Sequence, residues 1–177
     1  MNPASHVPDE LATTPVLVVD DDPDILETLG DYLRQRGLTV ATAHDGRAAI
    51  AALERGRFGL VLTDISMPGA DGFEVLRAAR AANSSAYVVV MTGYASLESA
   101  ITAVRAGAHD YLTKPFSLGQ IEVMLNAIND RSKLERENRD LTARTSAAVE
   151  PSMAGRLDAI EQRLQRIEGL LSRLARR

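Results

Sequence analysis

The chain has 177 residues, a net charge of −4 and no cysteine, which excludes disulfides, thiolate metal sites and cysteine nucleophiles and fits a cytoplasmic protein. Its length suits one domain with an appendage, and no apolar run approaches the ~18 residues that span a bilayer, so we expect no membrane insertion. The charge is uneven, with −8 over residues 1–130 and +4 over residues 131–177. A solvated helix with ion pairs explains the basic end better than a nucleic-acid-binding arm.

Residues 1–14 are polar, contain Pro3 and Pro8, and are predicted to form a disordered leader. Strands and helices then alternate. The predicted strands are 16–20, 38–43, 59–63, 87–91 and 110–113, and the predicted helices are 23–36, 46–55, 72–82, 97–106 and one that starts near 118. Strands rich in Val and Leu that alternate with helices are typical of a parallel sheet covered on both faces. We therefore predict a five-stranded, doubly wound α/β domain over residues 15–130.

Capping residues support these helix boundaries. Asp22-Pro23 indicates an N-cap with proline at the first helical position. Two pairs have the spacing of a capping box: Asp71 with Glu74, and Ser117 with Gln120. Three glycines occupy positions where a left-handed C-terminal cap is expected: Gly37, Gly56 and Gly107. The three histidines, His6, His44 and His109, are too scattered for a zinc site, and we assign His44 and His109 to the surface.

Polar side chains of complementary kinds stand at the ends of four predicted strands. Asp20 and Asp21 end the first, Asp64 follows the third, Thr92 follows the fourth and Lys114 follows the fifth. Open α/β sheets place their chemistry at the carboxyl ends of the strands. These residues offer acids for a divalent cation, a nucleophilic carboxylate, a hydroxyl donor and an ammonium. Such a set suits the handling of a phosphoryl group.

Four motifs in this order resemble the receiver domain of two-component response regulators over about residues 15–130. They are Val-Val-Asp-Asp-Asp at 18–22, Leu-Thr-Asp at 62–64 followed by Met-Pro-Gly-Ala-Asp-Gly at 67–72, Met-Thr-Gly at 91–93 and Lys-Pro-Phe at 114–116. The resemblance implies a flavodoxin-like fold. Gly93-Tyr94 and the stretch 105–111 look most like receivers of the family that activates sigma-54 polymerase, whose ATPase and DNA-binding domains we do not find here.

The resemblance implies that Asp64 is the phosphoacceptor, which takes phosphate from a histidine kinase or phosphotransfer protein. Mg²⁺ would be held by the carboxylates of Asp21 and Asp64 and the backbone carbonyl of Ser66, with Asp20 acting through water. On this basis the chain is not an enzyme in the usual sense, although it assists its own phosphotransfer and dephosphorylation.

Two further strand-end residues acquire roles from the same resemblance. Lys114 would neutralise one phosphoryl oxygen, and the Thr92 hydroxyl would hydrogen-bond another. Thr92 and Tyr111 would then form the switch that reports phosphorylation to the surface. The family also implies a cis peptide bond between Lys114 and Pro115, whereas the base rate for X-Pro bonds, ~5%, favours trans.

The basic end is predicted to be a helical linker, 131–150, followed by a coiled coil, 151–177. One heptad register places Leu157, Leu164 and Leu171 at position a and Ile160, Ile167 and Leu174 at position d. Arg at position g and Glu at position e attract each other between parallel helices. We therefore expect a homo-oligomer of parallel helices. Leu at a with Ile at d favours trimers or tetramers, whereas Asn138 at an earlier a position favours dimers, so the number of chains in the oligomer stays open. A helix folded back on its own domain is the alternative.

Two other function classes were weighed. A haloacid-dehalogenase-like phosphatase also uses an aspartate after its first strand, but the signature Asp-x-Asp-x-Thr/Val is not met, because Asp24 stands where Thr or Val is required. A DNA-binding transcriptional regulator, or a fragment of one, is supported only by the Arg-rich end, and no helix-turn-helix pattern follows residue 117. A response regulator receiver therefore remains the leading hypothesis.

Overall fold

A computed structural model describes residues 14–93 and 97–143, so the predicted leader and coiled coil lie outside the described residues. The chain divides into two units, residues 1–132 and 133–177. The first unit contains five strands, namely β1 (Val16–Val19), β2 (Val40–Ala43), β3 (Leu60–Asp64), β4 (Tyr87–Thr92) and β5 (Asp110–Thr113). They form one parallel sheet in the order β2-β1-β3-β4-β5. The predicted five-stranded, doubly wound α/β fold is therefore confirmed.

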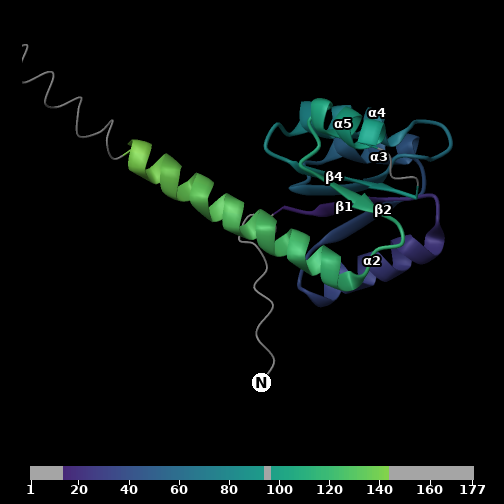
Figure 1. Ribbon diagram of the computed structural model, residues 1–177, viewed down its shortest axis with the longest axis horizontal. Helices are drawn as coiled ribbons and strands as arrows, with labels where there is room; N and C mark the ends of the chain where they lie inside the picture. Colours follow the sequence, from purple (N-terminus) through teal and green to yellow (C-terminus); the bar gives the residue numbers. More distant parts are fainter. Residues whose placement is uncertain (1–13, 94–96, 144–177) are drawn as a thin grey trace, which may run out of the picture. The chain divides into compact units, whose positions relative to one another are not determined.

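Helices cover both faces of this sheet, as Figure 1 shows. They are α2 (Pro23–Gln35), α3 (Gly46–Arg55), α4 (Gly72–Ala82) and α5 (Leu97–Arg105), followed by helical residues 118–143. α3, α4 and α5 lie on one side of the sheet, with α2 on the other (Figure 1). Within the described residues no helix is long and apolar enough to cross a membrane.

The two faces of the sheet form two separate cores because side chains alternate along each strand. Val16 and Val18 of β1 belong to the core that α2 and residues 121–128 cover. Leu17 and Val19 belong to the core that α3, α4 and α5 cover. All residues of β1, β3 and β4 are buried, as expected for strands with helices on both sides. A rigid, fully buried centre therefore supports the loops at each edge.

Most of the predicted caps are present. The Asp22 carboxylate accepts the Asp24 amide, and both capping boxes form. Gly37 and Gly107 have positive φ angles of 83° and 94°, as left-handed caps require. The prediction for Gly56 is wrong, because its φ is −151° and its ψ is 158°. The chain leaves α3 directly in an extended conformation towards β3, so no left-handed residue is needed.

Three local predictions need correction. The second strand begins at Val40 rather than at residue 38. Asp64 is the last residue of β3, paired with Met91, rather than the residue after the strand. His109 is half-buried rather than a surface residue: its Nδ1 accepts the Val88 amide at 3.2 Å, and its ring packs on that of Tyr87. Pairing between β4 and the start of β5 brings it there, which no local pattern indicates.

Candidate functional site

The carboxyl edge of the sheet gathers the predicted strand-end side chains. β1 and β3 are neighbours, and their register pairs Val19 with Thr63. The next residues along each chain, Asp20 and Asp64, therefore lie side by side. Both are buried, with 0% and 5% of their surface exposed. A buried pair of like charges requires a cation close by.

Lys114 supplies that cation. Its ammonium Nζ lies 2.6 Å from Asp20 Oδ2 and 2.9 Å from Asp64 Oδ2. Lys114 follows β5, which β4 separates from β3, so its long side chain crosses the end of β4 to reach the two acids. The Lys114 amide also donates to the Thr92 carbonyl at 2.7 Å, which anchors the lysine backbone to the end of β4.

Backbone amides fix the other oxygens of the two acids. The Asp22 amide donates to Asp20 Oδ1 at 3.1 Å, and the Ser66 amide makes a longer contact of 3.5 Å with Asp64 Oδ1. Each aspartate is thus held between a backbone N–H on one oxygen and the ammonium of Lys114 on the other. The carboxylates are positioned before any ligand arrives.

The surroundings shift the pKa of two of these groups. Burial raises the pKa of Asp20 above its ordinary value, and its hydrogen bond with Lys114 only partly offsets this. Burial lowers the pKa of Lys114, but hydrogen bonds and charges from Asp20 and Asp64 outweigh that effect and leave the pKa raised. Lys114 therefore stays cationic at neutral pH, which is the state that attracts a phosphoryl oxygen.

Asp20, Asp21 and Asp64 fit a divalent cation. Each offers one carboxylate oxygen, and these oxygens lie within 4.8 Å of one another. Asp21 is exposed, so its carboxylate is open to solvent and ions. Hard carboxylate oxygens with room for water are the ligands that Mg²⁺ prefers. Ser66 stands two residues after Asp64 in the following loop, where its carbonyl could add a further oxygen.

Gly72 keeps the backbone around Asp64 tight, a role that the sequence reasoning missed. A Cβ at this position would lie 2.1 Å from the Asp64 carbonyl oxygen. The Gly72 amide donates to the Ile65 carbonyl at 3.0 Å, so the first residue of α4 closes directly onto the end of β3. The signal was the Asp71-Gly72 pair, which served above as a helix start and as part of the motif at 67–72, but neither use indicated this close backbone approach.

Thr92 and Tyr111 are placed on adjacent strands. Thr92 is buried at the end of β4, with 2% of its surface exposed, and Tyr111 is half-buried in β5. The Tyr111 hydroxyl lies 2.8 Å from Ser99 Oγ of α5. Sequence reasoning missed Ser99, because only the packing of α5 against β5 brings it to the tyrosine. The tyrosine ring is thereby tied to the helix that covers this part of the sheet.

The structure thus brings Asp20, Asp21, Asp64 and Lys114 into one cluster, with Thr92 at the end of the intervening strand. The Lys114–Pro115 bond is cis, as the resemblance implied. The predicted heptad residues all lie outside the described residues: Leu157, Ile160, Leu164, Ile167, Leu171 and Leu174.

The chain is similar in sequence to known transcriptional regulatory proteins. The C4-dicarboxylate transport transcriptional regulatory protein DctD of Pseudomonas aeruginosa is 35% identical over 93% of this chain, which spans 35% of that protein. Transcriptional regulatory protein TcrA of Mycobacterium tuberculosis is 37% identical over 68% of this chain and 48% of its own length. The chain therefore spans about a third to a half of these relatives.

The chain is also similar to solved structures of response regulators. A CheY-like response regulator receiver domain protein from Methanospirillum hungatei is 31% identical with a TM-score of 0.65, covering 69% of this chain and 98% of that one. A response regulator from Burkholderia pseudomallei with a phosphorylated aspartic acid and a calcium ion is 28% identical with a TM-score of 0.61, covering 70% and 72%. The family model for the response regulator receiver domain matches residues 16–126 of the sequence, and the chain belongs to this family of two-component systems.

Proposed function

We propose that this protein is a phosphoryl-accepting response regulator in which Asp64 receives phosphate from the histidine of a kinase or phosphotransfer protein. The observation that carries the proposal is the buried Asp64 carboxylate, held 2.9 Å from the Lys114 ammonium inside a cluster of three acids. The solved relative from Burkholderia pseudomallei bears a phosphorylated aspartic acid next to a calcium ion. A structural ion pair alone would not need the additional exposed acid, Asp21.

In the proposed reaction a carboxylate oxygen of Asp64 attacks the phosphorus of a phosphohistidine. The new O–P bond forms as the N–P bond breaks, and the imidazole leaves with the bonding electron pair and takes up a proton. The ammonium of Lys114, which lies beside Asp64, would then pair with a negatively charged phosphoryl oxygen. Asp20 keeps the lysine in position from the other side. Mg²⁺ held by Asp21, Asp64 and the Ser66 carbonyl, with Asp20 acting through water, would screen the repulsion between the carboxylate and the incoming phosphoryl group.

The signal would pass from Thr92 to Tyr111. A hydrogen bond from the Thr92 hydroxyl to the phosphoryl group would draw the threonine towards Asp64. The space it leaves would admit the Tyr111 ring, which would then break its 2.8 Å contact with Ser99. The surface formed by α5, β5 and residues 118–132 would change shape as a result. This surface would connect the site to partners or to a second copy.

We further propose that residues 15–130 act as the receiver, 131–150 as a helical linker and 151–177 as a parallel coiled coil that makes the protein a homo-oligomer in the cytoplasm. The support is the unbroken seam from Leu157 to Leu174 with attractive g–e pairs. Replacing Leu164 and Ile167 with Asp would bury charge in this seam and should give a monomer whose receiver still accepts phosphate. Sedimentation of the unchanged chain as a monomer at tens of micromolar would favour the folded-back helix instead.

Phosphate transfer has a direct test. Incubation with acetyl phosphate and Mg²⁺ should add one acid- and hydroxylamine-labile phosphoryl group, and Asp64→Asn should remove it. Asp31→Asn, an exposed acid on α2, is the matched control and should be labelled normally. Persistent labelling of Asp64→Asn would refute the assignment. Hydrolysis of a generic phosphomonoester that needs Asp20 but not Asp64 would favour the phosphatase alternative.

A further inference from the structure

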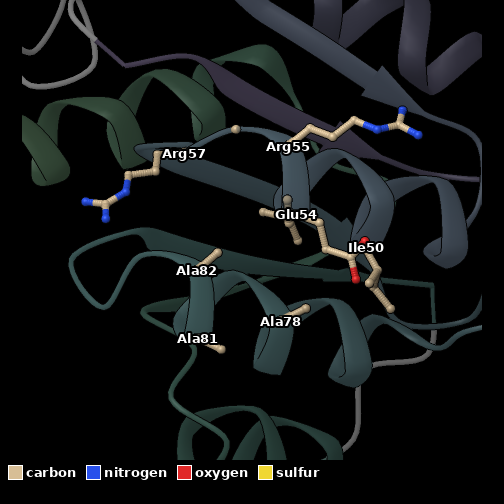
Figure 2. A pocket seen from close by; sticks show the side chains of 9 residues that line it. Ile50, Glu54, Arg55, Arg57, Ala78, Ala81 and Ala82 are labelled. Atoms are coloured by element: carbon tan, nitrogen blue, oxygen red, sulfur yellow. The ribbon is translucent and has the colours of Figure 1, made fainter.

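A groove lies between the C-terminal ends of α3 and α4, at the amino edge of the sheet, where the strands begin. This edge is opposite the carboxyl edge that holds Asp64 and Lys114. Its volume is about 610 Å³. Ile50 and Leu53 of α3 and Ala78 and Ala82 of α4 form its apolar lining. The helices leave it open because α4 presents only alanine methyl groups there, as Figure 2 shows.

Two arginines stand at the rim of this groove. Arg55 is the last residue of α3, Arg57 lies in the following loop, and Figure 2 shows their side chains extending in opposite directions. Both are exposed, and among the described residues neither side chain makes an ion pair or a hydrogen bond. Glu54 also lines the groove, so the two arginines and this glutamate together give the groove a net charge of +1. An apolar occupant with acidic groups would complement it.

The chain itself enters the domain at this edge. In a parallel sheet the intervening helices run antiparallel to the strands, so the ends of α3 and α4 lie where the strands begin. β1 begins there, and the Pro15 carbonyl just before it accepts the Gly59 amide at 3.0 Å. Gly59 is only two residues beyond Arg57, which is at most ~7 Å of extended chain. The described part of the chain, which starts at Thr14, therefore begins next to the groove.

The composition of these residues matches the groove. They contain Asp9 and Glu10 but no Lys or Arg, and Leu11 follows the two acids. Asp9 stands six positions before Pro15, and a stretch of this length can span ~20 Å when extended. Pro8 restricts the backbone before the acids, which lowers the entropy lost on docking. Residues 131–177 carry +4 and would be repelled by Arg55 and Arg57.

We propose that residues 7–11 of the same chain dock in the α3–α4 groove, with Leu11 on the apolar lining and Asp9 and Glu10 against Arg55 and Arg57. Each ion pair is weak at the surface, but the tether holds the segment at an effective concentration near millimolar, so a low intrinsic affinity suffices. The docked segment would cover the amino edge of the sheet and leave the phosphoryl site free. The proposal does not depend on phosphorylation of Asp64.

The absence of cysteine allows a direct test on the full chain. A nitroxide on Ser5→Cys should broaden the amide signals of residues 50–57 and 78–82 in NMR spectra. Arg55→Glu with Arg57→Glu should lower the docked-to-free ratio roughly 2- to 30-fold, since two exposed pairs are lost. Arg77→Glu, exposed on α4 but outside the groove, should leave the broadening unchanged.

A charge reversal completes the experiment. Asp9→Arg with Glu10→Arg changes only residues that precede the sheet, so it should abolish the broadening without affecting the fold. Combining it with Arg55→Glu and Arg57→Glu should restore the broadening. Absence of broadening in the labelled chain, or broadening of unchanged strength in either double variant, would overturn the proposal. As a separate sample, chains that carry the nitroxide but no ¹⁵N can be mixed with ¹⁵N chains that carry no nitroxide. Broadening of the ¹⁵N signals in that mixture would assign the groove to a second copy instead.

Discussion

The two edges of the sheet treat charge in opposite ways. At the carboxyl edge Lys114 is nearly enclosed, with 17% of its side chain exposed, and it lies between two buried aspartates. At the amino edge Arg55 and Arg57 are exposed and without ion pairs among the described residues. Burial makes an unpaired charge costly, so the charges of the carboxyl edge hold one another in place. Solvent stabilises those of the amino edge, which are therefore free to meet a partner.

Helix direction reinforces this difference. α2, α3 and α4 begin at the carboxyl edge, each behind an aspartate N-cap: Asp22, Asp45 and Asp71. Helix N-termini carry partial positive charge, which favours a phosphoryl group at that edge. The helices end at the amino edge, where their dipoles favour cations such as Arg55. The same topology thus prepares one edge for anion chemistry and the other for basic side chains.

The largest expected effect is at the exposed acid of the carboxyl edge. Asp21→Ala removes one of three metal-binding carboxylates, so Mg²⁺ affinity and labelling by acetyl phosphate should both be lost while the fold remains. Mg²⁺ titration followed by NMR and the labelling assay measure the two effects. Asp24→Ala, also exposed but outside the cluster, should behave like the unchanged protein. Unchanged Mg²⁺ affinity in Asp21→Ala would remove this residue from the site.

The next effect separates Lys114 from Thr92. Lys114→Ala should slow labelling and lower the free energy of unfolding, because Asp20 and Asp64 lose their shared cation. The raised pKa of Lys114 means that its stabilisation is complete below its ordinary value of 10.5 and is lost as the pH rises through the folded value. Thr92→Ala should still be labelled but should not move Tyr111, as read from the tyrosine NMR signals. If Thr92→Ala were as inactive as Asp64→Asn, this division of roles would be wrong.

A smaller effect is expected where α4 closes onto β3. Gly72→Ala places a Cβ 2.1 Å from the Asp64 carbonyl oxygen, so the backbone must shift. We expect a loss of about 1–3 kcal/mol in the free energy of unfolding, with slower labelling because Asp64 moves. Gly119→Ala is the matched control: its nearest neighbouring atom is 3.7 Å away, and it should stabilise by up to ~1 kcal/mol. Equal stability of the two variants in urea denaturation would contradict the tight approach.

The smallest effect is at the amino edge. Arg57→Ala removes an exposed charge that has no ion pair among the described residues, so stability should change by less than ~0.5 kcal/mol. Labelling should be unchanged, because Arg57 precedes β3 while Asp64 ends it. Urea denaturation and the acetyl phosphate assay test both statements. A clear change in labelling would show that the two edges are coupled and that the contrast between them is incomplete.

The site was predictable because its residues have local markers. Asp64 ends the Val/Leu-rich strand β3 and Lys114 follows the short strand β5, and a parallel topology brings such strand ends to one edge. Ser99 and His109 were not predictable in the same way. Each acts through a partner on another element, Tyr111 and Val88 respectively, and no pattern around either residue indicates that partner.

The sequence by itself determined the order of strands and helices, most of their caps and the motifs that identify the acids, lysine and threonine. Those features depend on side-chain periodicity and on hydrogen bonds within a few residues. Only the tertiary structure decided that Lys114 crosses β4 to join both Asp20 and Asp64, and that Gly72 contacts the backbone of Asp64. It also decided that a groove remains between α3 and α4. These features depend on the packing of segments far apart in the chain, which local propensities do not encode.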